Sequence, residues 1–114
     1  MESTDYSYPL GTHMTETIKL AVDLEPDDVQ SPADVDSYAV MLYYDREIGE
    51  EDIEQVQIAR IDDREHGGPH LDRFFSEEGG RDHLDPNLAF DEAEDQLRTN
   101  WRQYVRRYHD NFGF

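Results

Sequence analysis

The sequence predicts an α+β domain, in which a four-stranded, mainly antiparallel sheet precedes one long C-terminal helix packed on one of its faces. Four segments between residues 15 and 75 carry apolar residues in alternating or continuous runs of strand length, and turn-forming residues separate them. After residue 85 the apolar residues instead recur every three or four positions, as on one side of a helix. The predicted order is β-β-β-β-α, and 114 residues are enough for one such domain.

Residues 1–14 carry Ser, Thr, Pro and Gly without periodicity, so we expect a flexible lead-in and a single domain over residues 15–114.

The first two predicted strands differ in the number of their faces that are apolar. Residues 15–23 alternate apolar and polar side chains, as a half-buried strand does. Residues 35–45 are apolar on both faces, which favours a central position in the sheet.

The third and fourth strands form a hairpin. We expect the third at residues 53–62 and a short fourth at residues 70–75, joined by a turn that contains Gly67 and Gly68. Residues 76–83 are expected to be a loop.

The C-terminal helix has clear start signals. Asp85 is a good N-cap, and Pro86 suits the first helical position because its missing N–H has no partner there anyway. Acidic residues cluster near the N-terminal end and arginines near the C-terminal end, which complements the helix dipole. We expect Trp101 to be buried, because it lies on the apolar stripe. The stripe consists of Phe90, Ala93, Leu97, Trp101, Tyr104, Val105 and Tyr108.

The charge balance is strongly acidic. Twenty-eight acidic residues stand against ten basic ones, the net charge is −18, and Lys19 is the single lysine. Such a composition is compatible with disorder, but thirteen aromatic residues and the patterned β-branched segments argue against it. Carboxylates hold water and hydrated cations in concentrated salt, where charge repulsion is screened. We therefore expect a protein from an extreme halophile, archaeal in origin, in which net charge does not argue against nucleic-acid binding.

Other classes of protein are excluded or disfavoured by composition. There is no cysteine, which excludes disulfides, thiolate zinc sites and cysteine nucleophiles. The longest apolar stretch, residues 38–44, is too short to span a membrane, and no secretory signal is visible. We expect a soluble cytoplasmic protein without a membrane partner.

Potentially functional side chains are densest in the hairpin over residues 60–74. Arg60 and Asp62 share one face of their strand, and His70 and Asp72 share one face of the next. Whether the two pairs meet depends on the strand register, which the sequence alone does not determine.

Three interpretations of this hairpin stay open. It is a structural network of ion pairs, a catalytic or RNA-contacting group, or a metal site formed by His66, His70 and a carboxylate. The spacing of the two histidines is diagnostic of zinc on a helix, and Gly67, Gly68 and Pro69 rule out a helix here. We therefore expect neither a metal ion nor another cofactor.

A short motif runs through the hairpin: Arg60 and Asp62 end one strand, His66 and Gly67 form a turn, and His70 enters the next strand. The motif resembles that of a family of small uncharacterised haloarchaeal proteins, which are distantly similar to toxin components of type II toxin–antitoxin modules. Residues 100–104 look like the C-terminal helix of the same family, and the resemblance covers roughly residues 35–110. In the toxins the strand after the turn tends to be richer in histidine and arginine, whereas Leu71 and Asp72 precede Arg73 here.

The resemblance implies a toxin–antitoxin-like protein that binds or cleaves RNA and has an antitoxin-like protein partner. An enzyme of this kind would be a metal-independent ribonuclease, in which His66 or His70 moves protons next to Asp62. Arg60 or Arg73 would then steady the phosphate.

Two further features bear on function. Arg98, Arg102 and Arg106 are spaced at i, i+4 and i+8, and they are either a phosphate track or a complement to the helix dipole that pairs with Glu94 and Asp95. The alternative function is that of a non-catalytic interaction domain, which pairs with a partner protein through a sheet edge.

Overall fold

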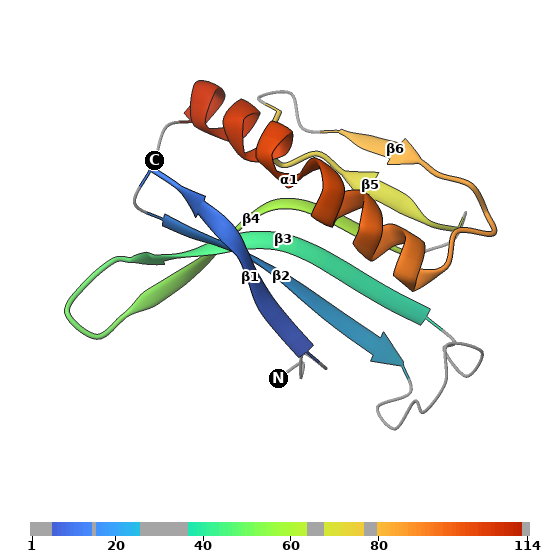
Figure 1. Cartoon of the computed structure of the whole chain (residues 1–114), viewed down its shortest axis with the longest axis horizontal. Coiled ribbons are helices and arrows are strands. Elements are labelled where there is room, and N and C mark those ends of the chain that lie inside the picture. Colours follow the sequence, from blue (N-terminus) through green and yellow to red (C-terminus); the bar gives the residue numbers. More distant parts are fainter. Residues whose placement is uncertain (1–5, 15, 26–36, 64–67, 77–79, 113–114) are drawn as a thin grey trace.

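Six antiparallel strands form one sheet, and a single helix lies across one face of it in the computed structural model, which describes residues 6–14, 16–25, 37–63, 68–76 and 80–112 (Figure 1). Each strand pairs with its neighbours in the sequence, so the sheet is a meander. The predicted α+β class and C-terminal helix are confirmed, but the sheet has six strands instead of four. The elements are β1 (Tyr6–His13), β2 (Glu16–Glu25), β3 (Ser37–Glu47), β4 (Ile53–Asp62), β5 (His70–Asp72), β6 (Arg81–His83) and α1 (Phe90–Phe112).

The first additional strand, β1, lies within the expected lead-in. Tyr6 and Tyr8 pair with residues of β2, and both hydroxyls donate hydrogen bonds to the Glu94 carboxylate on α1. Pro9 fits because β1 is an edge strand, where a missing N–H costs little. The register shifts between Pro9 and Gly11. The alternation of Tyr6, Tyr8 and Leu10 was therefore a strand signal, which the proline and glycine obscured.

The second additional strand, β6, lies in the segment expected to be a loop. It is three residues long and exposed, and it pairs with β5. β5 itself ends at Asp72, three residues before the predicted end of the fourth strand. The sequence of β6 contains no apolar residue, so periodicity gave no signal for it.

The helix begins at Phe90, four residues after the predicted start. The Asp85 side chain accepts a hydrogen bond from the Asn87 backbone N–H, and the Leu88 N–H bonds to the Asp85 carbonyl. Asp85 therefore closes a turn that precedes the helix. The helix cap lies at Ala89, whose backbone N–H donates to the Glu92 side chain, an arrangement that leaves fewer orphan N–H groups at the helix end.

The core lies between α1 and the sheet. The buried stripe of the helix packs against the apolar faces of the central strands, and Trp101 is only 5% exposed, which confirms its predicted burial. Gly11 of β1 is needed at the Trp101 contact, because a Cβ there would come within 2.9 Å of the indole ring. The helix contributes Ala93, Leu97, Trp101 and Val105, and the strands contribute chiefly Ile18, Leu20, Val22, Val40, Leu42, Tyr44, Ile58 and Ile61.

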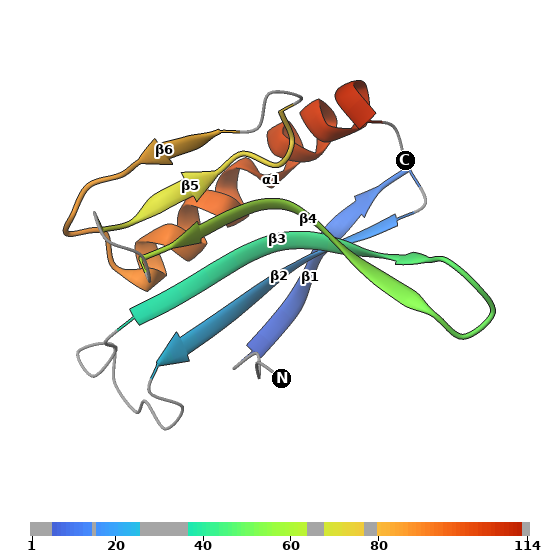
Figure 2. The same cartoon turned by 180° about the vertical axis from the view of Figure 1, so that it is seen from behind.

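Strand β4 has different neighbours along its length. It pairs with β3 over its whole length, from Glu47↔Ile53 to Ala39↔Asp62, but β5 pairs only with Arg60–Asp62. Residues 53–59 of β4 therefore have a strand on one side only within the described part of the chain. Figure 2 shows the β3–β4 hairpin projecting past the other strands. We call residues 53–59 the free edge of β4.

Candidate functional site

The structure brings together four of the polar residues singled out in the hairpin. Arg60 pairs with Asp72 and Asp62 pairs with His70 in the β4–β5 ladder, so all four side chains lie on the same face of the sheet. That face is the one away from α1, because the alternate residues on β4 and β5 belong to the core under the helix. The register that the sequence left undetermined is therefore the one in which the two pairs meet.

These side chains form a continuous charged network. His70 Nε2 lies 3.3 Å from Asp62 Oδ1 and 3.7 Å from Asp72 Oδ2. Each aspartate uses its other oxygen for an arginine: Arg60 Nε lies 2.8 Å from Asp62 Oδ2, and Arg81 Nε donates to Asp72 Oδ1 over 2.8 Å. We call Arg60, Asp62, His70, Asp72 and Arg81 the β4–β5 network. Arg81 of β6 was not among the predicted site residues.

The centre of the network is sealed from solvent. His70 is 1% exposed and Asp62 is 5% exposed, whereas the arginines at the two ends are partly exposed. A general acid or base must come within hydrogen-bond reach of its substrate. In this conformation the His70 ring does not offer that access.

Arg73, another predicted catalytic residue, does not join the network in the described part of the chain. Arg73 Nε lies 3.3 Å from Asp82 Oδ2, and Asp82 pairs with the core residue Leu71, which places this ion pair on the helix side of the sheet. His66 and Gly67 lie outside the described residues, so the proposed motif is seen only in part.

The arginine row on α1 lies on the opposite side of the sheet from the network. Arg98, Arg102 and Arg106 are exposed on the outer surface of the helix. Arg98 bonds to Asp95, which raises the pKa of the guanidinium further, and Arg102 stacks over the Trp101 ring at 4.8 Å. The row therefore does not lie beside the hairpin network, and the bond of Arg98 to Asp95 fits the pairing alternative. Phosphate binding by the row stays a prediction.

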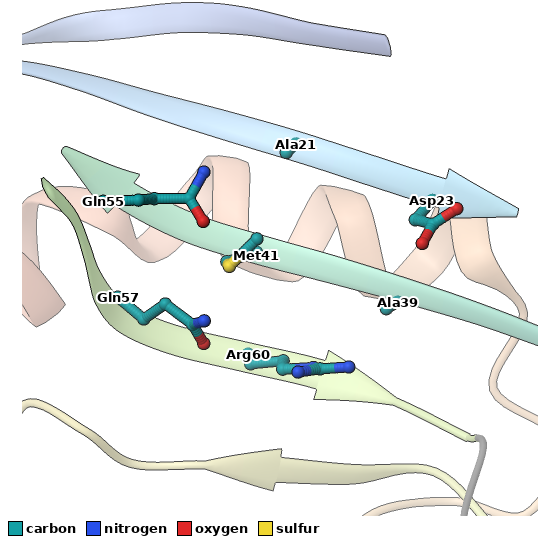
Figure 3. Close-up of a pocket in the computed structure, with 7 residues that line it drawn as sticks. All are labelled: Ala21, Asp23, Ala39, Met41, Gln55, Gln57 and Arg60. Atoms are coloured by element: carbon teal, nitrogen blue, oxygen red, sulfur yellow. The ribbon is translucent and has the colours of Figure 1, made fainter. Parts of the chain in front are cut away.

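A shallow hollow lies on the open face of the sheet next to the network (Figure 3). Its volume is about 110 Å³, and Arg60 belongs both to its lining and to the network. The hollow was not predicted from the sequence, because its residues come from three strands. The lining is formed by Ala21, Asp23, Ala39, Met41, Gln55, Gln57 and Arg60.

A larger groove, of about 460 Å³, lies beside the free edge of β4. Its lining consists of Gln57 of β4, Phe74 from the segment after β5, and Tyr108 and Phe112 near the end of α1. Phe74 is 40% exposed and Phe112 is 51% exposed, which is unusual for rings of this size in a small domain. The groove was not predicted from the sequence either, because its lining residues come from three segments that are far apart in the chain.

The tip of the β3–β4 hairpin is acidic. Arg46 and Glu54 form an exposed ion pair near the tip, and the other charged residues there are all carboxylates. The exposed acidic residues of this region, which we call the acidic tip, are Glu47, Glu50, Glu51, Asp52 and Glu54.

Comparison with known proteins places the chain in a family. A family model described as a domain of unknown function, DUF7718, matches residues 1–113. No curated protein and no solved structure matches the chain. Over the residues that the structure describes, α1 is too polar to cross a membrane.

Proposed function

We propose that this chain, which belongs to the DUF7718 family, is a protein-binding domain that takes an extended segment of a partner protein onto the free edge of β4. The observation that carries the proposal is the difference in length between β4 and β5. Because β5 covers only Arg60–Asp62, the outward backbone N–H and C=O groups of residues 53–59 have no strand partner in the described structure. An added strand satisfies such groups directly.

The surroundings of the free edge favour a strand as the bound form. About seven residues of edge give a strand roughly 23 Å long at 3.3 Å per residue, which is an ordinary strand length. The groove beside the edge contains Phe74, Tyr108 and Phe112, and it can receive the apolar side chains that alternate along one face of the incoming segment. Backbone hydrogen bonds would give affinity and the groove would give specificity.

Charge determines which segment fits. The free edge begins at the acidic tip, and a second copy of this chain, which itself carries a net charge of −18, would add negative charge next to Glu54 and its neighbours. A segment with lysine or arginine at the end that meets the tip is attracted instead. We therefore infer a different, basic partner protein, and the antitoxin-like partner implied by the sequence resemblance belongs to this class.

Hydrogen exchange with a synthetic peptide tests the proposal. The probe is an eight-residue peptide of alternating valine and arginine, and its control has proline at every second position and so lacks half of its N–H donors. The valine–arginine peptide should protect amides of residues 53–59, and Phe74→Ala should weaken binding about tenfold, which corresponds to the loss of one well-packed ring.

The matched control variant is Ile48→Ala. Ile48 is 58% exposed at the hairpin tip and lies outside the groove, so binding should be unchanged. Equal binding of the two peptides, or protection that appears at β1 and not at β4, would overturn the proposal.

The RNA-acting alternative has one observation in its favour, because Arg60, Asp62 and His70 of the sequence motif lie together in the fold. The burial of His70 counts against cleavage by this ring. The test is incubation of the purified protein with RNA in molar KCl, together with expression in a halophilic host. We expect no cleavage and no toxicity; cleavage that His70→Gln abolishes without a change in thermal midpoint would favour the RNA-acting alternative.

We also propose that the protein works in concentrated salt in the cytoplasm of a halophilic archaeon. The support is compositional: the net charge of −18, the single lysine and the exposed carboxylates of the acidic tip all suit a solvent that screens repulsion.

A further inference from the structure

We propose that Asp62, His70 and Asp72 form a binding site for one divalent transition-metal ion of the zinc type. The ligand atoms of these three residues all lie within 4.8 Å of one another on β4 and β5. One imidazole nitrogen and two carboxylate oxygens are a donor set that zinc and its neighbours accept. The inference is independent of partner binding at the free edge, which involves other residues.

The spacing of the atoms suits a tetrahedral ion. Two ligands about 2.1 Å from a tetrahedral zinc ion lie about 3.4 Å apart. The distances from His70 Nε2 to the nearest oxygens of Asp62 and Asp72 are 3.3 Å and 3.7 Å. Small side-chain movements would bring all three atoms to metal–ligand distance, and a water molecule would complete the coordination.

The state of the His70 ring is the second observation. Its Nε2 atom is buried and makes no hydrogen bond to any described residue, although it faces two carboxylates. Its other nitrogen, Nδ1, lies 3.4 Å from the Gly68 carbonyl oxygen. A proton on Nδ1 donates to that carbonyl and leaves the Nε2 lone pair directed between Asp62 and Asp72. Histidines that bind metals commonly donate their other N–H to a backbone carbonyl in this way.

The arginines at the ends of the network support the aspartates as ligands. Arg60 holds one oxygen of Asp62, and Arg81 holds one oxygen of Asp72, so the remaining oxygen of each carboxylate faces the His70 ring. Such contacts fix the orientation of a ligating carboxylate. Without a cation between them, the lone pair of Nε2 and the two oxygens repel one another. Either a metal ion or a proton on Nε2 removes the repulsion, and the experiment below distinguishes the two.

The test is metal titration of the untagged, full-length protein after dialysis against EDTA in molar KCl. ZnCl₂ should bind with a stoichiometry of one ion per chain and raise the thermal midpoint by at least about 5 °C at saturation. CoCl₂ should give the intense visible absorption of tetrahedral cobalt. Asp72→Asn should weaken zinc binding at least tenfold.

Asp82→Asn is the matched control. Asp82 is a neighbouring carboxylate that is also paired with an arginine, but it lies on the other face of the sheet, so its loss should leave zinc affinity unchanged. His70→Gln should abolish binding; if this variant does not fold, Asp72→Asn decides the question because the Asp72 side chain is 16% exposed. Absence of saturable zinc binding, or equal affinity in Asp72→Asn and Asp82→Asn, would overturn the proposal and leave a hydrogen atom on Nε2 as the explanation.

Discussion

The two halves of β4 contrast within a single strand. In the C-terminal half, Ile58, Ala59 and Ile61 are fully buried, and β5 covers the outer edge from Arg60 onward. In the N-terminal half, Ile53 is 66% exposed and the outer edge is uncovered in the described structure. The same strand is thus part of the core at one end and an available surface at the other.

Under the proposed function, the two halves separate stability from recognition. The covered half combines apolar residues beneath α1 with the β4–β5 network on the open face. In the free half, β3 is the only strand partner within the described part of the chain, and the outer backbone edge is open. Changes in the covered half should therefore lower stability, whereas the same changes in the free half should leave stability nearly unchanged.

The largest expected effect concerns salt and the acidic tip of the free half. Dialysis from molar KCl to about 0.1 M lengthens the Debye length from about 3 to about 10 Å and exposes the carboxylates to one another. We expect cooperative loss of structure, measured by circular dichroism. Neutralising Glu50, Glu51 and Asp52 to their amides should move the transition to lower KCl. An unchanged spectrum and melting temperature across the range would remove the argument for salt adaptation.

The next prediction compares two acidic residues of β4, each paired with an arginine. Asp62→Ala should lower the free energy of unfolding by on the order of 3 kcal/mol, because it removes the buried carboxylate that both Arg60 and the buried His70 ring face. Glu54→Ala removes an exposed pair with Arg46 and should cost less than about 1 kcal/mol. Urea denaturation in molar KCl measures both. Equal losses of unfolding free energy in the two variants would show that ion pairs in the two halves of β4 contribute equally to stability.

Two isoleucines provide the apolar version of the comparison. Ile61 is fully buried, so Ile61→Ala should cost about 2–5 kcal/mol through lost transfer energy and the cavity that remains. Ile53→Ala should change stability by less than about 0.5 kcal/mol, since the side chain is already in water. Thermal and urea unfolding report both values, and a cost above about 1 kcal/mol for Ile53→Ala would mean that the free half is covered in solution.

The smallest effect appears at high pH. Tyr44 lies on β3 opposite Val56 of the free half, and burial, followed by the influence of Tyr108, raises its pKa to about 12. The folded state therefore binds the phenolic proton more tightly than the unfolded state, whose pKa is about 10. The contribution of Tyr44 to the free energy of unfolding is therefore fully present below pH 10. It is lost as the pH rises through 12, and the loss from this group is on the order of 2 kcal/mol.

Tyr44→Phe isolates this contribution. The phenylalanine variant should show a flatter decline of unfolding free energy between pH 10 and pH 12 than the parent protein. Identical slopes in the two proteins would assign the alkaline loss of stability to other tyrosines. Tyr8 is one of these, because burial and a hydrogen bond to Glu94 raise its pKa to about 12 as well.

The sequence predicted the interior of the fold better than its edges. Strands β2, β3 and β4 were predicted nearly at their observed positions. Each of them is buried on one or both faces, and such burial produces an alternating or continuous run of apolar residues in the sequence. Strands β1 and β6 carry little of that signal: Pro9 and Gly11 interrupt the first, and Arg81–His83 is entirely polar. The predicted helix start was four residues too early, because Asp85 closes a turn instead of capping the helix. The turn is fixed by hydrogen bonds from the backbone N–H groups of Asn87 and Leu88 to Asp85, which the sequence alone does not determine.

The sequence identified several residues of the site but not the burial of the site. Arg60, Asp62 and His70 were named as candidates, but whether they meet was left open because the strand register was not determined; the β4–β5 ladder brings them together. The burial of His70 was not predictable, because it depends on the register and on a strand, β6, that has no apolar pattern. The apolar groove depends on where β5 stops and on Phe74 and Phe112, which lie far apart in the sequence.

The meander order has a consequence for synthesis of the protein. All six strands precede α1, so the sheet is completed in the nascent chain before the helix that covers its apolar face has been made. At about 5–20 residues per second, the stretch from His83 to Phe112 takes roughly 2–6 seconds to translate. During that interval the growing chain exposes the residues that α1 later buries, and the concentrated salt proposed above would strengthen their apolar association. Ribosome stalling or premature termination within this stretch should therefore release an aggregation-prone sheet.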